Sequence, residues 1–172
     1  MSRLGVVVGN PKARSRTLTV AQAVADRTAE ALGLTVDERV VVDLADLTHG
    51  LFDWSSAEVR AAVEAVAACD LLVVASPTYK AAYTGLLKSF LDWFPTTGLS
   101  GVTTVPVMVG AGAAHALAVE VHLRPVLVEI GASLPTRGLY VLEQELDALD
   151  AAVDEWLVEA AAPLRAAISA VG

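Results

Sequence analysis

The sequence predicts an α/β protein in which a parallel sheet of five strands lies between two layers of helices. Short apolar runs, which suit strands buried on both faces, alternate with longer segments of helical periodicity. This alternation occurs five times along the 172 residues, and no repeat, linker or low-complexity tract interrupts it. We therefore expect a single domain over residues 1–172.

The first two units each contain a clear strand and a clear helix. Leu4 to Val8 is a short apolar strand, and residues 17–32 follow with helical spacing, closed by Gly33. A second strand is predicted over residues 35–44. The helix after it runs from Ser56 to Ala68, because Ser56 is a favourable N-cap residue.

The third unit is the most distinctive stretch of the chain. Residues 71–75 form an unbroken apolar run between Asp70 and Pro77, which is typical of a central parallel strand. From Thr84 onward, apolar residues recur at helical spacing as far as Phe94. A strand therefore leads into a helix through the loop from Ser76 to Tyr83.

The last two units differ in how clear their strands are. A fourth strand is predicted over residues 103–109, with a helix from about Ala116 to Ile130. The fifth strand, within residues 134–142, contains Pro135 and Gly138, which places it near an edge of the sheet. Acidic residues then precede a final amphipathic helix. Right-handed crossovers between these units favour the flavodoxin-like strand order 2-1-3-4-5.

Composition and charge restrict the function. The net charge of −8 argues against nucleic acid as a partner. Residues 1–36 are different, because five basic and two acidic residues give them a net charge of +3 and leave −11 for the remainder. A small anion is therefore a plausible ligand near the N-terminus.

The chain has one cysteine, Cys69, so it cannot form an internal disulfide, and a reducing compartment is favoured. The N-terminal apolar run is too short for a signal peptide. Prolines and glycines interrupt the uncharged stretch between Trp93 and Val119, which argues against a membrane span. We expect a cytoplasmic protein.

In the predicted strand order, the loops after strands one, three and four meet at one edge of the sheet. The first loop is basic and rich in hydroxyl groups, and it leads into a helix N-terminus. Ser15, Arg16 and Thr17, with Lys12 and Arg14 nearby, are therefore candidates to bind a phosphate. Alternatively, Ser15 only caps the helix and the basic side chains are solvated. The loop has neither the Walker pattern nor GxGxxG.

The second and third loops suit a flat ring. Pro77 stiffens the loop after the third strand, Tyr79 offers an aromatic face, Lys80 a cation, and the N–H groups of residues 78 to 80 could contact ring heteroatoms. Taken singly, Tyr79 is more typical of an ordinary half-buried aromatic side chain, and Lys80 of a solvated surface charge. The third loop, GAGAAH, lets a ligand approach its backbone closely, and it ends at His115. Together the three loops indicate a mononucleotide with a flat ring.

Three motifs resemble the NAD(P)H-dependent FMN reductase family, and most closely its sulfonate-utilisation branch. GNPKARSRT is similar to that branch's GSPR-x-x-SRS. SPTYKAAYTGLLKSFLD is similar to TPVYKA-x-x-G-x-LK-x-LLD, and GAGAAHALAVEVHLRPVL to GG-x-x-AHLLA-x-x-x-x-LKPVL. The resemblance covers almost the whole chain and is most specific in the second motif.

The resemblance implies a flavodoxin-like fold, FMN bound at this edge of the sheet, and hydride transfer from NADPH or NADH to FMN. It implies phosphate binding by Ser15, Arg16 and Thr17, with Asn10 in the position of a family serine. It places Pro77, Thr78, Tyr79 and Lys80 beside the isoalloxazine, and Gly110, Ala111, Gly112 and His115 on another side of it. No residue is assigned as a catalytic acid, a nucleophile or a metal ligand.

The resemblance also implies partners. Reduced FMN would pass to a flavin-dependent monooxygenase, and the chain would form a homodimer or homotetramer through its third and fourth helices. Val121 stands where the sulfonate branch often has a tyrosine, so properties that depend on that tyrosine are not transferred. Arg14 or Arg16 is a candidate to contact a 2′-phosphate, which would favour NADPH over NADH.

Other functions are possible. A quinone or azo reductase would keep FMN as a bound group, and a flavodoxin-type electron carrier would have no activity with pyridine nucleotides. The carrier is disfavoured because the chain lacks a T-x-T-G-N-T-type phosphate loop. A hydrolase is disfavoured because there is no G-x-S-x-G motif.

Overall fold

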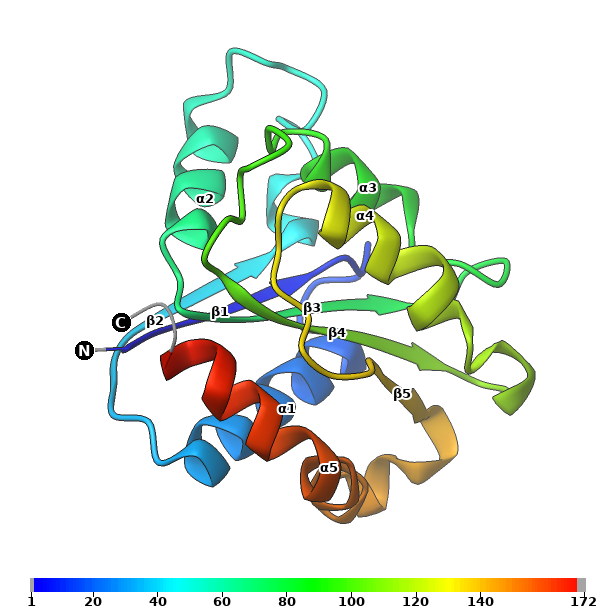
Figure 1. Ribbon diagram of the computed structural model, residues 1–172. Coiled ribbons are helices and arrows are strands. Elements are labelled where there is room, and N and C mark those ends of the chain that lie inside the picture. Colours follow the sequence, from blue (N-terminus) through cyan, green and yellow to red (C-terminus); the bar gives the residue numbers. More distant parts are fainter. Residues whose placement is uncertain (1, 170–172) are drawn as a thin grey trace.

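The structure is a computed structural model that describes residues 2–169, and its strands form one five-stranded parallel sheet (Figure 1). The strand order is β2-β1-β3-β4-β5, as the sequence predicted, and the fold is flavodoxin-like. The strands are β1 (Ser2–Val8), β2 (Val36–Asp43), β3 (Leu71–Pro77), β4 (Thr103–Gly110) and β5 (Leu139–Leu142).

Helices cover both faces of the sheet (Figure 1). The lower face in the figure is covered by α1 (Arg16–Leu32) and α5 (Leu149–Ser169), and the upper face by α2 (Ala57–Ala67), α3 (Gly85–Leu91) and α4 (Arg124–Glu129). Consecutive residues of β3 point to opposite faces: Val73 and Ala75 belong to the core with α1 and α5, whereas Leu72 and Val74 belong to the other core. Every residue of β3 is buried, which explains its unbroken apolar sequence.

The predicted helix ends are confirmed where the signal is local. Gly33 ends α1 in the left-handed conformation, with φ of 69°. The Ser56 hydroxyl accepts a hydrogen bond from the N–H of Val59 and so caps α2. Cys69 is buried beside β1, and its burial raises the pKa of the thiol to about 12, so it is a packing residue.

The helix predicted from Ala116 to Ile130 is not continuous. A 3₁₀ turn at Ala113–His115 is followed by a π-helical segment, η3 (Val119–Leu123), and only then by α4. Pro125 accounts for the change, because it has no N–H to donate and its ring crowds the carbonyl four residues earlier. A wider π turn just before it relieves that crowding.

Two other boundaries differ from the prediction. The third helix ends at Leu91 and not at Phe94, although Phe94 stays buried and packs edge to face on Phe90 with ring centroids 5.5 Å apart. Only residues 139–142 of the predicted fifth strand pair with β4.

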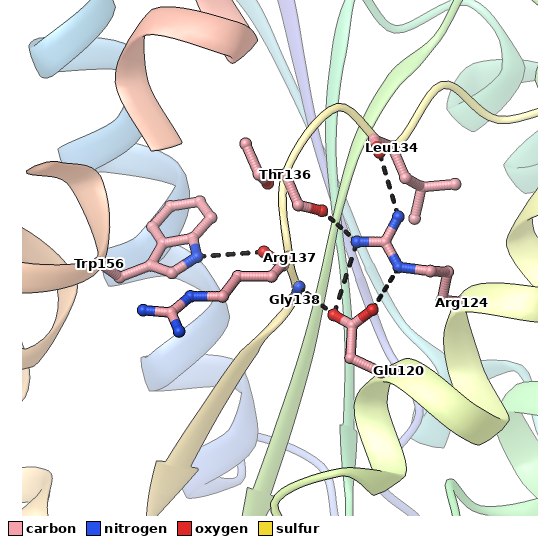
Figure 2. A network of polar contacts seen from close by, with 7 residues as sticks. All are labelled: Glu120, Arg124, Leu134, Thr136, Arg137, Gly138 and Trp156. Carbon is pink, nitrogen blue, oxygen red and sulfur yellow. Dashed lines mark hydrogen bonds and ion pairs between the residues drawn. The ribbon is translucent and has the colours of Figure 1, made fainter. Parts of the chain in front are cut away.

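Residues 134–138 are held by side chains from α4, η3 and α5 (Figure 2). Glu120 accepts hydrogen bonds from Arg124 Nε at 2.6 Å and from the N–H of Gly138 at 2.5 Å. Arg124 donates to the carbonyls of Leu134, at 3.0 Å, and Thr136, and the indole N–H of Trp156 donates to the carbonyl of Arg137. These side chains satisfy backbone groups where β5, an edge strand, begins.

Within residues 2–169, no helix combines the length and the apolar character needed to cross a bilayer.

We predict that the stability given by Glu120 depends on pH. Burial would raise the pKa of Glu120, but the hydrogen bonds from Arg124 and from the Gly138 N–H outweigh it and lower the pKa below the ordinary value of 4.5. The stabilisation is therefore present above the ordinary pKa and is lost as pH falls through the lowered one. Glu120→Gln should reduce the free energy of unfolding by about 1 kcal/mol at about pH 7, and by less below about pH 4.

Urea unfolding at the two pH values would measure this difference. Glu145→Gln is a matched control, because it makes the same change at an exposed carboxylate just after β5. A difference for Glu120→Gln that did not change with pH would contradict the proposed ionic contribution.

Candidate functional site

A cavity of about 260 Å³ lies where the loops after β1 and β3 meet the end of β4. Six of the residues predicted for the site line it. They are Asn10, Ser15, Arg16, Thr17, Pro77 and Tyr79. The other lining residues are Lys12, Arg14, Val109 and Glu143. The structure thus brings the basic loop and the aromatic loop together around one space.

Hydrogen bonds among its own residues fix the loop after β1. Asn10 Nδ2 donates to the Thr17 hydroxyl at 3.0 Å, and Asn10 Oδ1 accepts from the N–H of Lys12 at 2.9 Å. Ser15 is buried and caps α1 by accepting from the N–H of Leu18 at 3.3 Å, so its capping role is confirmed. The buried Thr17 hydroxyl accepts from Asn10 and still has its own proton to donate.

Asp43 also holds this loop, a contact that sequence reasoning did not find. Arg14 has a φ of 51°, in the left-handed region that side chains other than glycine rarely adopt. Its N–H donates to Asp43 Oδ2 at 2.9 Å, from the end of the neighbouring strand β2. The hydrogen bond helps to keep a strained residue in place at the edge of the cavity.

The cavity is lined by three cationic side chains and one carboxylate. Arg16 Nη2 lies 3.1 Å from Glu143 Oε2. Lys12 and Arg14 form no ion pair among residues 2–169. The balance of charge is therefore positive, which suits an anion.

The loop after β3 is a tight hairpin. Tyr79 and Ala82 exchange two backbone hydrogen bonds, of 2.9 and 3.1 Å, and Lys80 and Ala81 between them have φ of 52° and 64°. A two-residue turn with two positive φ values normally carries glycine or asparagine, so this turn is strained. Tyr79 is 51% exposed and lines the cavity.

The hairpin corrects one expectation about ligand contacts. The N–H of Thr78 donates to the carbonyl of Val109 at 2.7 Å, and the N–H of Tyr79 donates to Ala82. These two donors are used inside the protein, so they do not point to a ligand. Of the three N–H groups considered, only that of Lys80 stays a candidate.

Buried hydrogen bonds join the first loop to the second. The Thr84 hydroxyl donates to the carbonyl of Gly9 at 2.5 Å and accepts from the N–H of Leu87 at 3.1 Å. The N–H of Thr84 donates to the Ser76 hydroxyl at 3.0 Å. A Cβ on Gly9 would lie 2.5 Å from the Cβ of Leu87, so glycine is what lets the first loop approach α3.

The loop after β4 lies apart from the cavity wall. Gly110, Ala111, Gly112 and His115 do not line the cavity, nor do Thr78 and Lys80. His115 is exposed. The loop is instead fixed by Tyr140 of β5, whose hydroxyl donates to the carbonyl of Gly112 at 3.1 Å. Sequence reasoning missed Tyr140 because it lies in a strand that carried no binding motif.

Comparison with known families supports a common origin. Residues 2–147 match the family model described as NADPH-dependent FMN reductase. The NADH-dependent FMN reductase SfnF of Pseudomonas putida is 33% identical over 148 residues, which cover 84% of this chain and 80% of that protein. An FMN reductase (NADPH) of Pseudomonas putida strain KT2440 is 31% identical over 156 residues, which cover 88% and 77%.

Solved structures show the same fold. The apo form of the NADH:FMN oxidoreductase EMOB has a TM-score of 0.70 and 30% sequence identity, over 92% of this chain and 89% of that one. An oxidoreductase from Corynebacterium diphtheriae has a TM-score of 0.83 and 26% identity, over 99% and 98%.

We predict that a side chain at residue 110 destabilises the protein. A Cβ on Gly110 would lie 1.9 Å from the Tyr140 hydroxyl oxygen, whereas a Cβ on Gly112 would have no neighbour within 4 Å. Gly110→Ala should therefore lower the free energy of unfolding by about 1–3 kcal/mol, because it displaces Tyr140. Gly112→Ala, the matched control, should change it little. Chemical denaturation of both variants would measure this, and equal stabilities would contradict the close approach.

Proposed function

This chain belongs to the NADPH-dependent FMN reductase family and is an NAD(P)H-dependent FMN reductase, and we propose that the cavity beside its first helix holds the phosphate of FMN. The observation that carries the proposal is the position of Lys12, Arg14 and Arg16 around the start of α1. The first N–H groups of a helix have no partner within it and favour an anion. Arg16 adds two donors in a planar arrangement that matches phosphate oxygens.

We further propose that Tyr79 and Pro77 lie beside the flavin rings and form one wall of the ring site. Both line the phosphate cavity, and the strained hairpin holds Tyr79 with its ring accessible. Lys80, at the tip of the hairpin, would put a positive charge near the electron-rich part of the ring system. Residues 110–115 would form a second wall, with Tyr140 fixing the carbonyl of Gly112.

When bound, FMN supplies the chemistry by accepting hydride from the nicotinamide. The residues of this chain bind and orient the two rings, and we assign no side chain as an acid or a nucleophile. Strain in a loop is common where a ligand must be presented in one geometry. The hairpin from Tyr79 to Ala82 fits that role.

We propose that FMN is an exchangeable substrate and that reduced FMN passes to a flavin-dependent monooxygenase. The similarity to SfnF, named an FMN reductase and not an electron carrier, supports this choice. The cation-rich loop, tied by side chains to α1 and β2, supports phosphate recognition without a flavodoxin-type loop. The cytoplasmic location expected from the single cysteine stays a prediction that cell fractionation would check.

Preference for NADPH is a separate proposal, because the relatives include both NADH- and NADPH-dependent enzymes by name. Arg14 or Arg16 would contact the 2′-phosphate. Arg14 has no carboxylate partner among the described residues, and this makes its side chain the more available of the two.

We predict that oxidation of NADPH requires added FMN. The purified protein should oxidise NADPH slowly alone and faster as FMN is added, with kcat/KM higher for NADPH than for NADH. For Arg14→Ala and Arg16→Ala, kcat/KM for NADPH would be divided by kcat/KM for NADH. A fall in this ratio identifies the residue that contacts the 2′-phosphate. Full turnover without added FMN would contradict the substrate role and favour a quinone or azo reductase. A yellow protein inactive with either nucleotide would be a carrier.

We also propose that the chain forms a homodimer or homotetramer through the helices after β3 and β4. Leu117, Val121 and Val128, spaced by four and by seven residues, are 71%, 57% and 55% exposed. A groove of about 380 Å³ runs between α3 and α4, and Pro125 and Val126 form part of it. A row of exposed apolar side chains beside a groove is typical of an interface.

A charge in this row should separate the subunits. Val121→Asp is expected to reduce the molar mass in solution, because an isolated carboxylate would be desolvated in the interface. Val158→Asp is the matched control, since Val158 is 83% exposed on α5, on the other face of the sheet. Light scattering after size-exclusion chromatography would measure the mass. A monomeric unmodified protein, or the same mass for both variants, would contradict the proposed interface.

A further inference from the structure

The ion pair between Arg16 and Glu143 joins two distant parts of the chain at the cavity. Glu143 follows directly after β5, and Arg16 begins α1, 127 residues earlier. Both side chains line the cavity that also contains Lys12, Arg14 and Thr17. Glu143 Oε2 accepts from Arg16 Nη2 at 3.1 Å. The pair is therefore part of the site and not an isolated surface contact.

An anion in this cavity faces both charges of the pair. The side chain of Arg16 is 67% exposed and that of Glu143 is 39% exposed, so solvent screens the pair and keeps it weak. A phosphate that takes the Nη2 donor of Arg16 must displace Glu143 or share the donor with it. It also comes close to a like charge, which disfavours its dianionic form.

The other acidic residue that contacts this loop is placed differently. Asp43 accepts the backbone N–H of Arg14 and the N–H of Ala45, so its carboxylate is occupied by the backbone and does not line the cavity. Among the described residues that line the cavity, Glu143 alone carries a negative charge. A site built only for tight phosphate binding gains nothing from that carboxylate.

We propose that Glu143 competes with the FMN phosphate for Arg16 and so limits the affinity for FMN and promotes its release. The inference rests on the proposed function of the cavity. The competition gives a physical reason why FMN exchanges: when FMN leaves, the ion pair between Arg16 and Glu143 forms again and offsets part of the lost binding energy. The effect should be specific to flavins that carry a phosphate.

The test compares the dissociation constants of FMN and riboflavin for the unmodified protein and for Glu143→Gln. Gln keeps the size and a hydrogen-bond acceptor but removes the charge. We expect Kd for FMN to fall about two- to fivefold, the range that an exposed ion pair of up to about 1 kcal/mol allows, and Kd for riboflavin to stay unchanged. Quenching of flavin fluorescence would measure both constants.

Glu145→Gln is the matched control. It removes the same charge two residues along the chain, at an exposed residue that does not line the cavity, and should leave both constants unchanged. In an Arg16→Gln background, Glu143→Gln should have a smaller effect on Kd for FMN, because the guanidinium for which Glu143 competes with the phosphate is absent. Higher salt should also reduce the difference between the unmodified protein and Glu143→Gln.

The outcomes separate this inference from the proposed function. If Glu143→Gln leaves Kd for FMN unchanged or raises it, Glu143 orients Arg16 or is irrelevant, and the inference is overturned while FMN binding stands. Equal tightening for riboflavin, or for Glu145→Gln, also overturns it, since the effect would not act through the phosphate. If the unmodified protein binds neither flavin, the proposed function fails and the inference fails with it.

Discussion

The candidate site depends on the buried hydroxyl of Thr84. It donates to the carbonyl of Gly9 and accepts from the first turn of α3, so one side chain both caps a helix and fixes the neighbouring loop. A buried hydroxyl needs such partners, because leaving them unmade costs about 1–3 kcal/mol. Gly9 makes the contact possible, since any side chain there would meet Leu87. The basic loop and the aromatic hairpin consequently keep one relative position.

Around this rigid centre, the charges oppose one another. Lys12, Arg14 and Arg16 attract an anion to the start of α1, while Glu143 reduces that attraction. The two loops that Thr84 joins are also strained, because they contain Arg14, Lys80 and Ala81, which all have positive φ. An enzyme that must release its flavin needs a site that is fixed in shape but moderate in affinity. The hydrogen-bonded loops fix the shape, and the competition that we propose between Glu143 and the phosphate would moderate the affinity.

The sequence predicted the elements whose signals are local. Caps such as Ser56 and Gly33 act on residues three or four positions away, so their types alone indicate where a helix begins or ends. The interruption of the predicted helix at Pro125 was missed, and whether a proline kinks a helix or widens it to a π turn depends on how that helix packs. Contacts that join distant residues could not be predicted: Asp43 to Arg14, Tyr140 to Gly112 and Glu143 to Arg16 have no periodic or spacing signal.

The sequence by itself determined the strand order, the edge of the sheet where the loops meet, and the basic and aromatic character of two of those loops. Apolar periodicity and the fixed hand of parallel crossovers leave few alternatives. Only the tertiary structure decided which residues line the cavity, that the N–H groups of Thr78 and Tyr79 are used internally, and that Arg16 is already paired. These depend on side-chain directions and on how separate segments approach one another, and Arg16 and Glu143 lie 127 residues apart. Composition and spacing do not specify such contacts.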